Sequence, residues 1–183
     1  MTVVEIILAA ATELGIADDV QAALEEGATA GEADAKNLLR CFNLVENELA
    51  LDYLPLVAEE SFKTDTGAVY FSEFSRSVSR ILKVCDGSGN AVAFKIFPDY
   101  LKTQPDEVVV RYAYVPKEKG FTDESDFKAY ASVRLFAYGI AAEYSLASGL
   151  FEEAAVWDKK YKEAITAAYR SHPCKAMASR RWV

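Results

Sequence analysis

The feature that most constrains the fold is a long run of apolar residues near the C-terminal end, spaced alternately three and four positions apart. This spacing places them on one face of an α-helix, which has about 3.6 residues per turn. Ser148-Gly149 interrupts the run, because glycine can close one helix there before Glu152-Glu153 open the next. The sequence therefore predicts an antiparallel helix pair over 122–171. The run comprises Tyr130, Val133, Ala137, Ile140, Tyr144, Ala147 and Phe151.

The N-terminal third has the same helical period. A first helix is expected from Thr2 to Leu14, and a second begins at Asp18-Asp19, where acids suit the positive end of the helix dipole. The third has the clearest apolar face, and Pro55 must kink or terminate it because proline cannot donate to the carbonyl four residues back. We expect N-terminal helices over 1–63. The apolar face of the third helix comprises Leu38, Phe42, Val45, Leu49, Tyr53 and Leu56.

The middle of the chain changes to β character. Val78–Val84 and Ala91–Phe97 are rich in β-branched and aromatic residues and flank the turn formers of 86–90, which predicts a hairpin. Glu107–Val115 alternates as a further strand. A small antiparallel β insertion is therefore expected over 64–118.

These patterns predict one α+β domain that is mainly α: a helical bundle with a long C-terminal αα-hairpin and a small inserted antiparallel β lobe. A chain of 183 residues fits a single domain. It buries enough surface to fold without a metal or a disulfide.

The charge is strongly asymmetric along the chain. Met1–Thr66 holds 14 acidic residues against three basic ones, whereas no acid follows Glu163 and the tail over 172–183 is basic. The net charge of −8 argues against a classical nucleic-acid binder, because phosphates repel acidic surfaces. The asymmetry suggests that the two ends face different neighbours, and a solvated acidic face with a basic tail explains it equally well.

The cysteines and the hydropathy indicate a cytoplasmic protein. Cys41, Cys85 and Cys174 are far apart in the sequence, as in reduced intracellular proteins. We expect no membrane span, because no run of 18 apolar residues occurs. We expect no signal peptide, because the apolar start lacks a basic region.

Residue types that carry chemistry occur without a catalytic pattern. His172 is the single histidine and lies in the tail, where an orienting partner is not expected. Gly87-Ser88-Gly89 is flanked by predicted strands, so it indicates a turn and not a phosphate-binding loop. Adjacent carboxylates such as Glu152-Glu153 point about 100° apart on a helix and do not converge on a substrate. We expect no enzymatic activity, no metal and no cofactor.

Two segments resemble parts of a known family. One is Asn43–Phe62, which resembles an N-terminal helix of small phage structural proteins, and the other is Ala137–Tyr144 with Gly149–Ala154 and Trp157–Tyr161. The order of helices, β insertion, helix pair and basic tail is also similar. The chain resembles the head-to-tail connector proteins, the adaptors beneath the portal of tailed bacteriophages.

The resemblance implies a virion protein that is made in the host cytoplasm and that acts by assembly. Such adaptors form homo-oligomeric rings, commonly of twelve, that bind the portal protein. They also dock a neck or tail completion protein and let the genomic DNA pass through without specific binding. In similar proteins the C-terminal segment inserts into the portal, and this role falls here on Arg180, Arg181 and Trp182. An Arg-Arg-Trp end also has the composition of interface hot spots.

The β lobe offers a second candidate surface. Phe94, Phe97 and Tyr100 are expected either to contact a neighbouring subunit or the next ring, or to form the core of the lobe. Other functions stay open: another phage neck or tail structural protein, a non-phage oligomeric scaffold or interaction module, and a hydrolase that acts through carboxylates.

Overall fold

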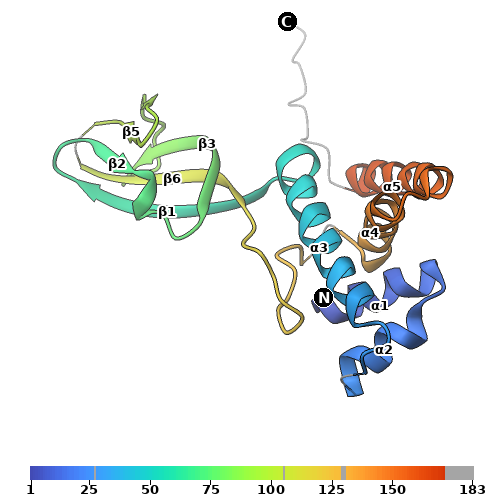
Figure 1. The fold of residues 1–183 in the computed structure, drawn as a ribbon. Coiled ribbons are helices and arrows are strands. Elements are labelled where there is room, and N and C mark those ends of the chain that lie inside the picture. The colour runs from blue at the N-terminus through green and yellow to red at the C-terminus, as the bar shows by residue number, and fades with distance from the viewer. Residues whose placement is uncertain (27, 105, 129–130, 172–183) are drawn as a thin grey trace, which may run out of the picture. The chain divides into compact units, whose positions relative to one another are not determined.

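The structure is a computed structural model that describes residues 1–26, 28–104, 106–128 and 131–171. The chain divides into two compact units: a helical unit of Met1–Val45 with the chain from Lys119 onward, and a β unit of Glu46–Glu118 (Figure 1). The fold is α+β and mainly α, with a C-terminal helical hairpin and small antiparallel sheets, which confirms the predicted fold class. The chain forms two units where one domain was expected.

The helical unit begins with α1 (Val3–Leu14) and α2 (Ala17–Glu26). The hydroxyl of Thr2 accepts a hydrogen bond from the backbone N–H of Glu5 at 3.2 Å and so caps α1. Gly15 ends α1 in the left-handed conformation, with φ of 74°, a conformation that glycine adopts without steric cost. The tight turn at Gly15 allows α2 to begin only two residues later.

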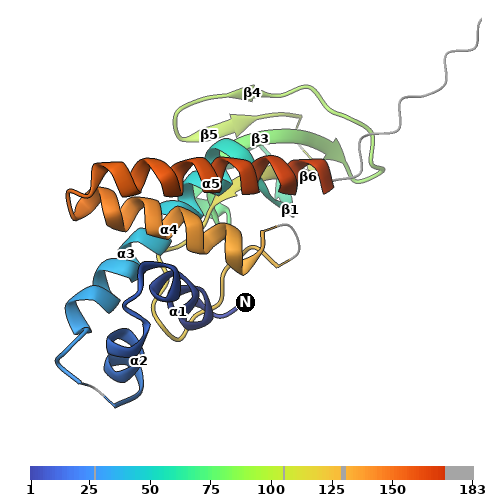
Figure 2. The same cartoon turned by 90° about the vertical axis from the view of Figure 1, so that its right-hand side faces the viewer.

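The central helix of the helical unit is α4 (Val133–Ala147), which lies between α1 and α5 (Phe151–Ser171) (Figure 2). Its eight residues from Leu135 to Ala142 are all buried. An amphipathic surface helix buries one stripe, so a helix buried around its whole circumference must have neighbours on several sides. The predicted helix pair is therefore present as α4 and α5, and Tyr130 lies outside the described residues.

The third helix, α3 (Glu32–Glu48), packs on α4 through residues on its predicted apolar face. The rings of Phe42 and Phe136 stack with their centroids 5.5 Å apart. In the first turn of α3, Asp34 accepts a hydrogen bond from the hydroxyl of Tyr144 at 2.7 Å. Burial, and then this bond to a carboxylate, raise the pKa of Tyr144 to about 12.

Gly139 provides the closest approach among these helices. A Cβ atom at this position would lie 2.8 Å from Cγ1 of Val45 on α3 and 2.9 Å from Cε2 of Tyr161 on α5. Both neighbours are almost completely buried, so neither can move aside easily. The glycine is therefore required by packing and not by its backbone conformation.

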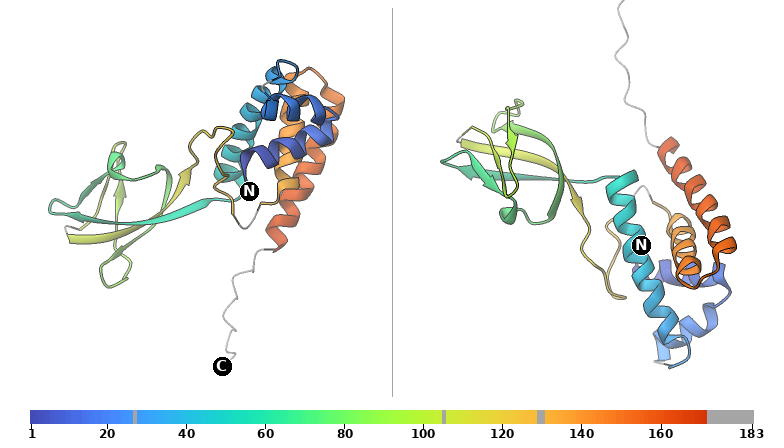
Figure 3. Two further views of the ribbon diagram at one scale, coloured as in Figure 1. Left: turned by 90° about the horizontal axis from the view of Figure 1, so that it is seen from below. Right: turned by 45° about the horizontal axis from the view of Figure 1, so that its top comes forward.

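The β unit contains two three-stranded antiparallel sheets (Figure 3). In the larger sheet, β6 (Asp106–Val115) lies between β1 (Leu56–Thr64) and β3 (Ser77–Asp86). In the smaller sheet, β5 (Tyr100–Lys102) lies between β2 (Ala68–Tyr70) and β4 (Lys95–Ile96). A short 3₁₀ helix, η2 (Phe71–Glu73), lies between β2 and β3 in the chain. Large side chains from both sheets share one core, among them Val69, Val84, Leu101, Val110 and Tyr112.

The predicted N-terminal helical region to residue 63 is wrong at its end. The helix α3 stops at Glu48, a π-helical turn η1 (Leu49–Tyr53) follows, and β1 begins at Leu56. Pro55 explains the change, because it has no N–H to donate and it disfavours helical conformation at Leu54. The segment Asn43–Phe62, which carried part of the family resemblance, is thus helical only in its first half.

The predicted hairpin between 78–84 and 91–97 is also wrong in its pairing. The strand β3 pairs with β6, and only the bridge between Cys85 and Ala91 joins it to the following segment. The turn itself is confirmed, since Oδ1 of Asp86 accepts hydrogen bonds from the backbone N–H groups of Ser88 and Asn90. The strand over Glu107–Val115 is confirmed as β6.

A polar cluster joins β1 to the loop before β3. The carboxylate of Glu60 accepts hydrogen bonds from the hydroxyl of Ser75 at 2.6 Å, from the backbone N–H of Ser75 at 3.1 Å, and from the hydroxyl of Tyr112. Burial would raise the pKa of Glu60, but these donors outweigh it and hold the pKa below its usual value. The ionised carboxylate therefore holds three donors together.

We expect Gly139→Ala to destabilise the helical unit by about 2 kcal/mol, because overpacking against Val45 and Tyr161 exceeds the roughly 1 kcal/mol that alanine gains in a helix. Urea unfolding followed by circular dichroism measures the change. Gly120→Ala is the matched control, since a Cβ there meets only Asp123 at 3.7 Å. A variant Gly139→Ala as stable as the parent would contradict the packing argument.

We expect Glu60→Gln to destabilise the β unit by about 1 kcal/mol at neutral pH, because an amide nitrogen cannot accept from these donors. The folded-state pKa of Glu60 lies below its value in the unfolded chain, so the carboxylate stabilises the fold above the unfolded pKa and loses this effect as the pH falls through the folded pKa. The parent should thus lose more stability on acidification than the variant. Glu59→Gln is the control, because its pair with Arg111 is exposed.

Candidate functional surfaces

Metal-ligating side chains do not cluster in the part of the chain that the structure describes. Within residues 1–26, 28–104, 106–128 and 131–171, no three His, Cys, Asp or Glu side chains are placed to hold a metal ion. His172 and Cys174 lie outside these residues. The adjacent carboxylates Glu59 and Glu60 point to opposite faces of β1, toward Arg111 and Ser75 respectively. The described helices include none that is long and apolar enough to cross a membrane.

The pKa of the Cys41 thiol is raised, and this shift lowers the reactivity of the thiol. It lies buried on α3 beside a hollow of about 440 Å³ that is also lined by Tyr144 and Glu143. Burial, and then the negative charge of Glu143, raise the pKa of the Cys41 thiol to about 11. A nucleophilic cysteine needs the opposite shift, so Cys41 has the character of a core residue.

At pH 8 we expect Cys41 to react with iodoacetamide about 100-fold more slowly in the folded chain than in urea, since the raised pKa leaves little thiolate. Alkylation followed by peptide mass spectrometry measures this rate. Glu143→Gln should speed the reaction modestly by removing one cause of the shift. Equal rates in the folded and unfolded chain would contradict the assignment.

The β unit exposes an aromatic ladder, defined here as Tyr70, Phe97 and Tyr100. Tyr70 on β2 is directly opposite Tyr100 on β5, and their ring centroids are 5.6 Å apart. Phe97 stacks on Tyr100 at 4.8 Å with an interplanar angle of 12°. Phe97 is 39% exposed and Tyr70 is 48% exposed, so much of the ladder contacts solvent. Exposed stacked aromatic rings of this kind are typical of partner-binding surfaces.

The structure brings together two of the three residues that the sequence placed on this surface. Phe97 and Tyr100 belong to the ladder, whereas Phe94 is partly buried and packs against the core of the β unit, as the alternative of a lobe core had placed it. Contact of these three residues with a neighbouring subunit or the next ring stays a prediction. Tyr70 was missed, because its pairing with Tyr100 depends on a strand register that short segments do not reveal.

The helical unit exposes an apolar patch, defined here as Leu44, Leu146 and Phe151. These side chains are 51%, 50% and 68% exposed and come from α3, α4 and α5. Leu44 and Leu146 line the hollow beside Cys41, and Leu146 and Phe151 line a second hollow of about 280 Å³. The two hollows share Glu143 and Leu146, so the patch is continuous.

Part of this patch can be recognised from the sequence. Leu44 and Leu146 fall outside the apolar stripes of their helices, so a helical period marks them as surface residues. Arg180, Arg181 and Trp182, the other predicted binding residues, lie outside the described residues.

Comparison of the sequence with protein-family models and with curated proteins finds no match.

Proposed function

We propose that the chain is a structural protein of a tailed-phage or prophage virion, a head-to-tail adaptor that works as one copy in a ring beneath the portal. In this role it extends the DNA channel and docks the neck or tail, and it catalyses no reaction. The observation that carries the proposal is the pair of exposed apolar surfaces on separate units. The aromatic ladder lies on the β unit and the apolar patch lies on the helical unit, so one chain offers two faces to two neighbours.

The energetics favour partners for both surfaces. Each exposed Leu or Phe side chain gains about 1.5–3 kcal/mol when it is fully buried. Soluble monomers usually scatter such residues singly, whereas here they gather around shared hollows or stack on one another. A subunit between a portal and a tail component needs both faces, because it must bind above and below as well as to its neighbours.

The charge supports the same role. A net charge of −8 keeps phosphates from adhering to the wall of a channel within a Debye length of about 8 Å. The basic end with Arg180, Arg181 and Trp182 is the proposed portal-binding segment, which carries the opposite charge to most of the chain.

The experiment is negative-stain electron microscopy of the purified chain, alone and mixed with the portal protein encoded nearby. We expect a ring, or added density beneath the portal. Truncation after Met177 should abolish portal binding, because it removes the Arg-Arg-Trp end.

Phe97→Ser with Tyr100→Ser is the matched variant on the other unit. It should leave portal binding intact and weaken attachment of the next ring. Portal binding that survives the truncation would rule out the tail's role, and a chain that neither forms rings nor binds the portal would rule out the adaptor.

A further inference from the structure

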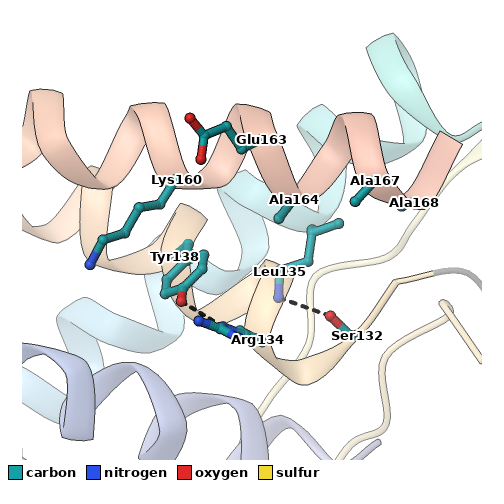
Figure 4. A pocket seen from close by; sticks show the side chains of 9 residues that line it. All are labelled: Ser132, Arg134, Leu135, Tyr138, Lys160, Glu163, Ala164, Ala167 and Ala168. Carbon is teal, nitrogen blue, oxygen red and sulfur yellow. Dashed lines mark hydrogen bonds between the residues drawn. The ribbon is translucent and has the colours of Figure 1, made fainter. Parts of the chain in front are cut away.

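A cationic groove runs between α4 and α5 of the helical unit (Figure 4). Its volume is about 550 Å³, and Ala164 and Ala168 of α5 leave the space that larger side chains would fill. Arg134 and Tyr138 line it from α4, and Lys160 lines it from α5. The groove belongs wholly to the helical unit and is separate from the apolar patch.

Arg134 and Lys160 converge on one aromatic ring. The Arg134 guanidinium donates to the hydroxyl of Tyr138 at 2.5 Å and lies 5.2 Å from the centre of its ring. The Lys160 ammonium lies 5.5 Å from the same ring and 3.8 Å from the ring of Trp157. Cation–π contacts hold both charges in place without neutralising them.

No carboxylate of the described residues pairs with either cation. Glu163 is the only acid among the lining residues, and in Figure 4 its carboxylate points away from Arg134 and Tyr138. The positive end of α4, capped by Ser132, lies at the same groove, and the first turn of α4 contains no acid. The site is therefore complementary to an acidic group supplied from outside the unit.

The acidic end of α2 has the opposite character. Asp18 and Asp19 lie exposed in its first turn, and its sequence contains no basic residue. Within the helical unit α2 lies on the far side of α1 from α4 and α5 (Figures 1 and 2). Neither aspartate makes an ion pair with Arg134 or Lys160 of the same copy, so a contact between the two surfaces requires a second molecule.

We propose that the α4–α5 groove binds the Asp18-Asp19 end of α2 from a second copy of this chain. The inference rests on the proposed function, because it assigns the contact between neighbouring subunits of the ring. Two different surfaces meet in a head-to-tail contact, which closes into a ring or continues as an open chain. Val156, 56% exposed and one turn before Lys160 on α5, adds apolar area beside the charges.

The test uses charge reversal on the full chain. The groove variant carries Arg134→Glu and Lys160→Glu, and the α2 variant carries Asp18→Lys and Asp19→Lys. Each should weaken self-association about 100-fold in sedimentation equilibrium, because like charges then meet across the contact. Mixing the two variants should restore assembly, since the reversed surfaces match each other, and restoration also shows that both variants fold. Lys83→Glu with Lys159→Glu is the control: both lysines are exposed and lie outside the groove and the apolar patch, so this variant makes the same change in charge and should assemble like the parent.

Other outcomes would overturn this contact, the adaptor role or both. Weakening without restoration would show that the groove binds another partner, and binding of a DNA duplex that the groove variant loses would assign it to phosphate. A chain that stays monomeric at every concentration, alone and with the portal, would also overturn it. If the groove variant forms the same ring as the parent, the proposed groove contact is wrong, but the adaptor proposal is unaffected. If the chain forms open chains through this contact and does not bind the portal, the contact is supported and the adaptor proposal is wrong.

Discussion

The burial of α4 is the constraint on which the helical unit depends. From Leu135 to Ala142 every residue is enclosed, so α1, α3 and α5 must each cover one part of its circumference. Gly139 permits this, because it lets Val45 and Tyr161 approach at distances that leave no space for a methyl group. A helix packed this closely has few alternative positions, since interiors of native density accommodate little change in volume.

Because the middle of α4 is buried, the exposed surfaces of the helical unit are formed by the ends of α4 and by the helices around it. One face of α5 packs on α4 through Ala154, Tyr161 and Ile165, and its flanks form the walls of two hollows on opposite sides. One flank is apolar around Phe151, whereas the other carries Lys160 beside Tyr138. Because the same helix supplies both walls, the core fixes the two surfaces relative to each other.

The sequence predicts the parts of the fold that local rules control. The spacing from Val133 to Phe151 and the glycine at 149 define the helix pair without any tertiary information. The rule fails at Leu56, because Leu49, Tyr53 and Leu56 keep a helical spacing that Pro55 overrides. Strand pairing fails for a similar reason: β3 follows a good turn but pairs with β6, a choice that depends on burial across about 30 residues. The aromatic ladder shows the same limit, since Tyr70 and Tyr100 meet only through the pairing of β2 with β5.

The distribution of charge limits which surfaces of two copies can attract each other. A chain with 28 acidic and 20 basic residues repels copies of itself at random orientations, which keeps it dispersed at moderate salt. Attraction then requires that a scarce cationic site meet an acidic one in a defined orientation. Arg134 and Lys160 are already held against aromatic rings, so their side chains would lose little conformational entropy on binding an acidic group. Electrostatic complementarity of this kind selects orientation more than it adds affinity, and exposed apolar groups such as Val156 supply the remainder. The proposed contact therefore needs both features, because neither the charges nor the apolar area alone would specify one geometry.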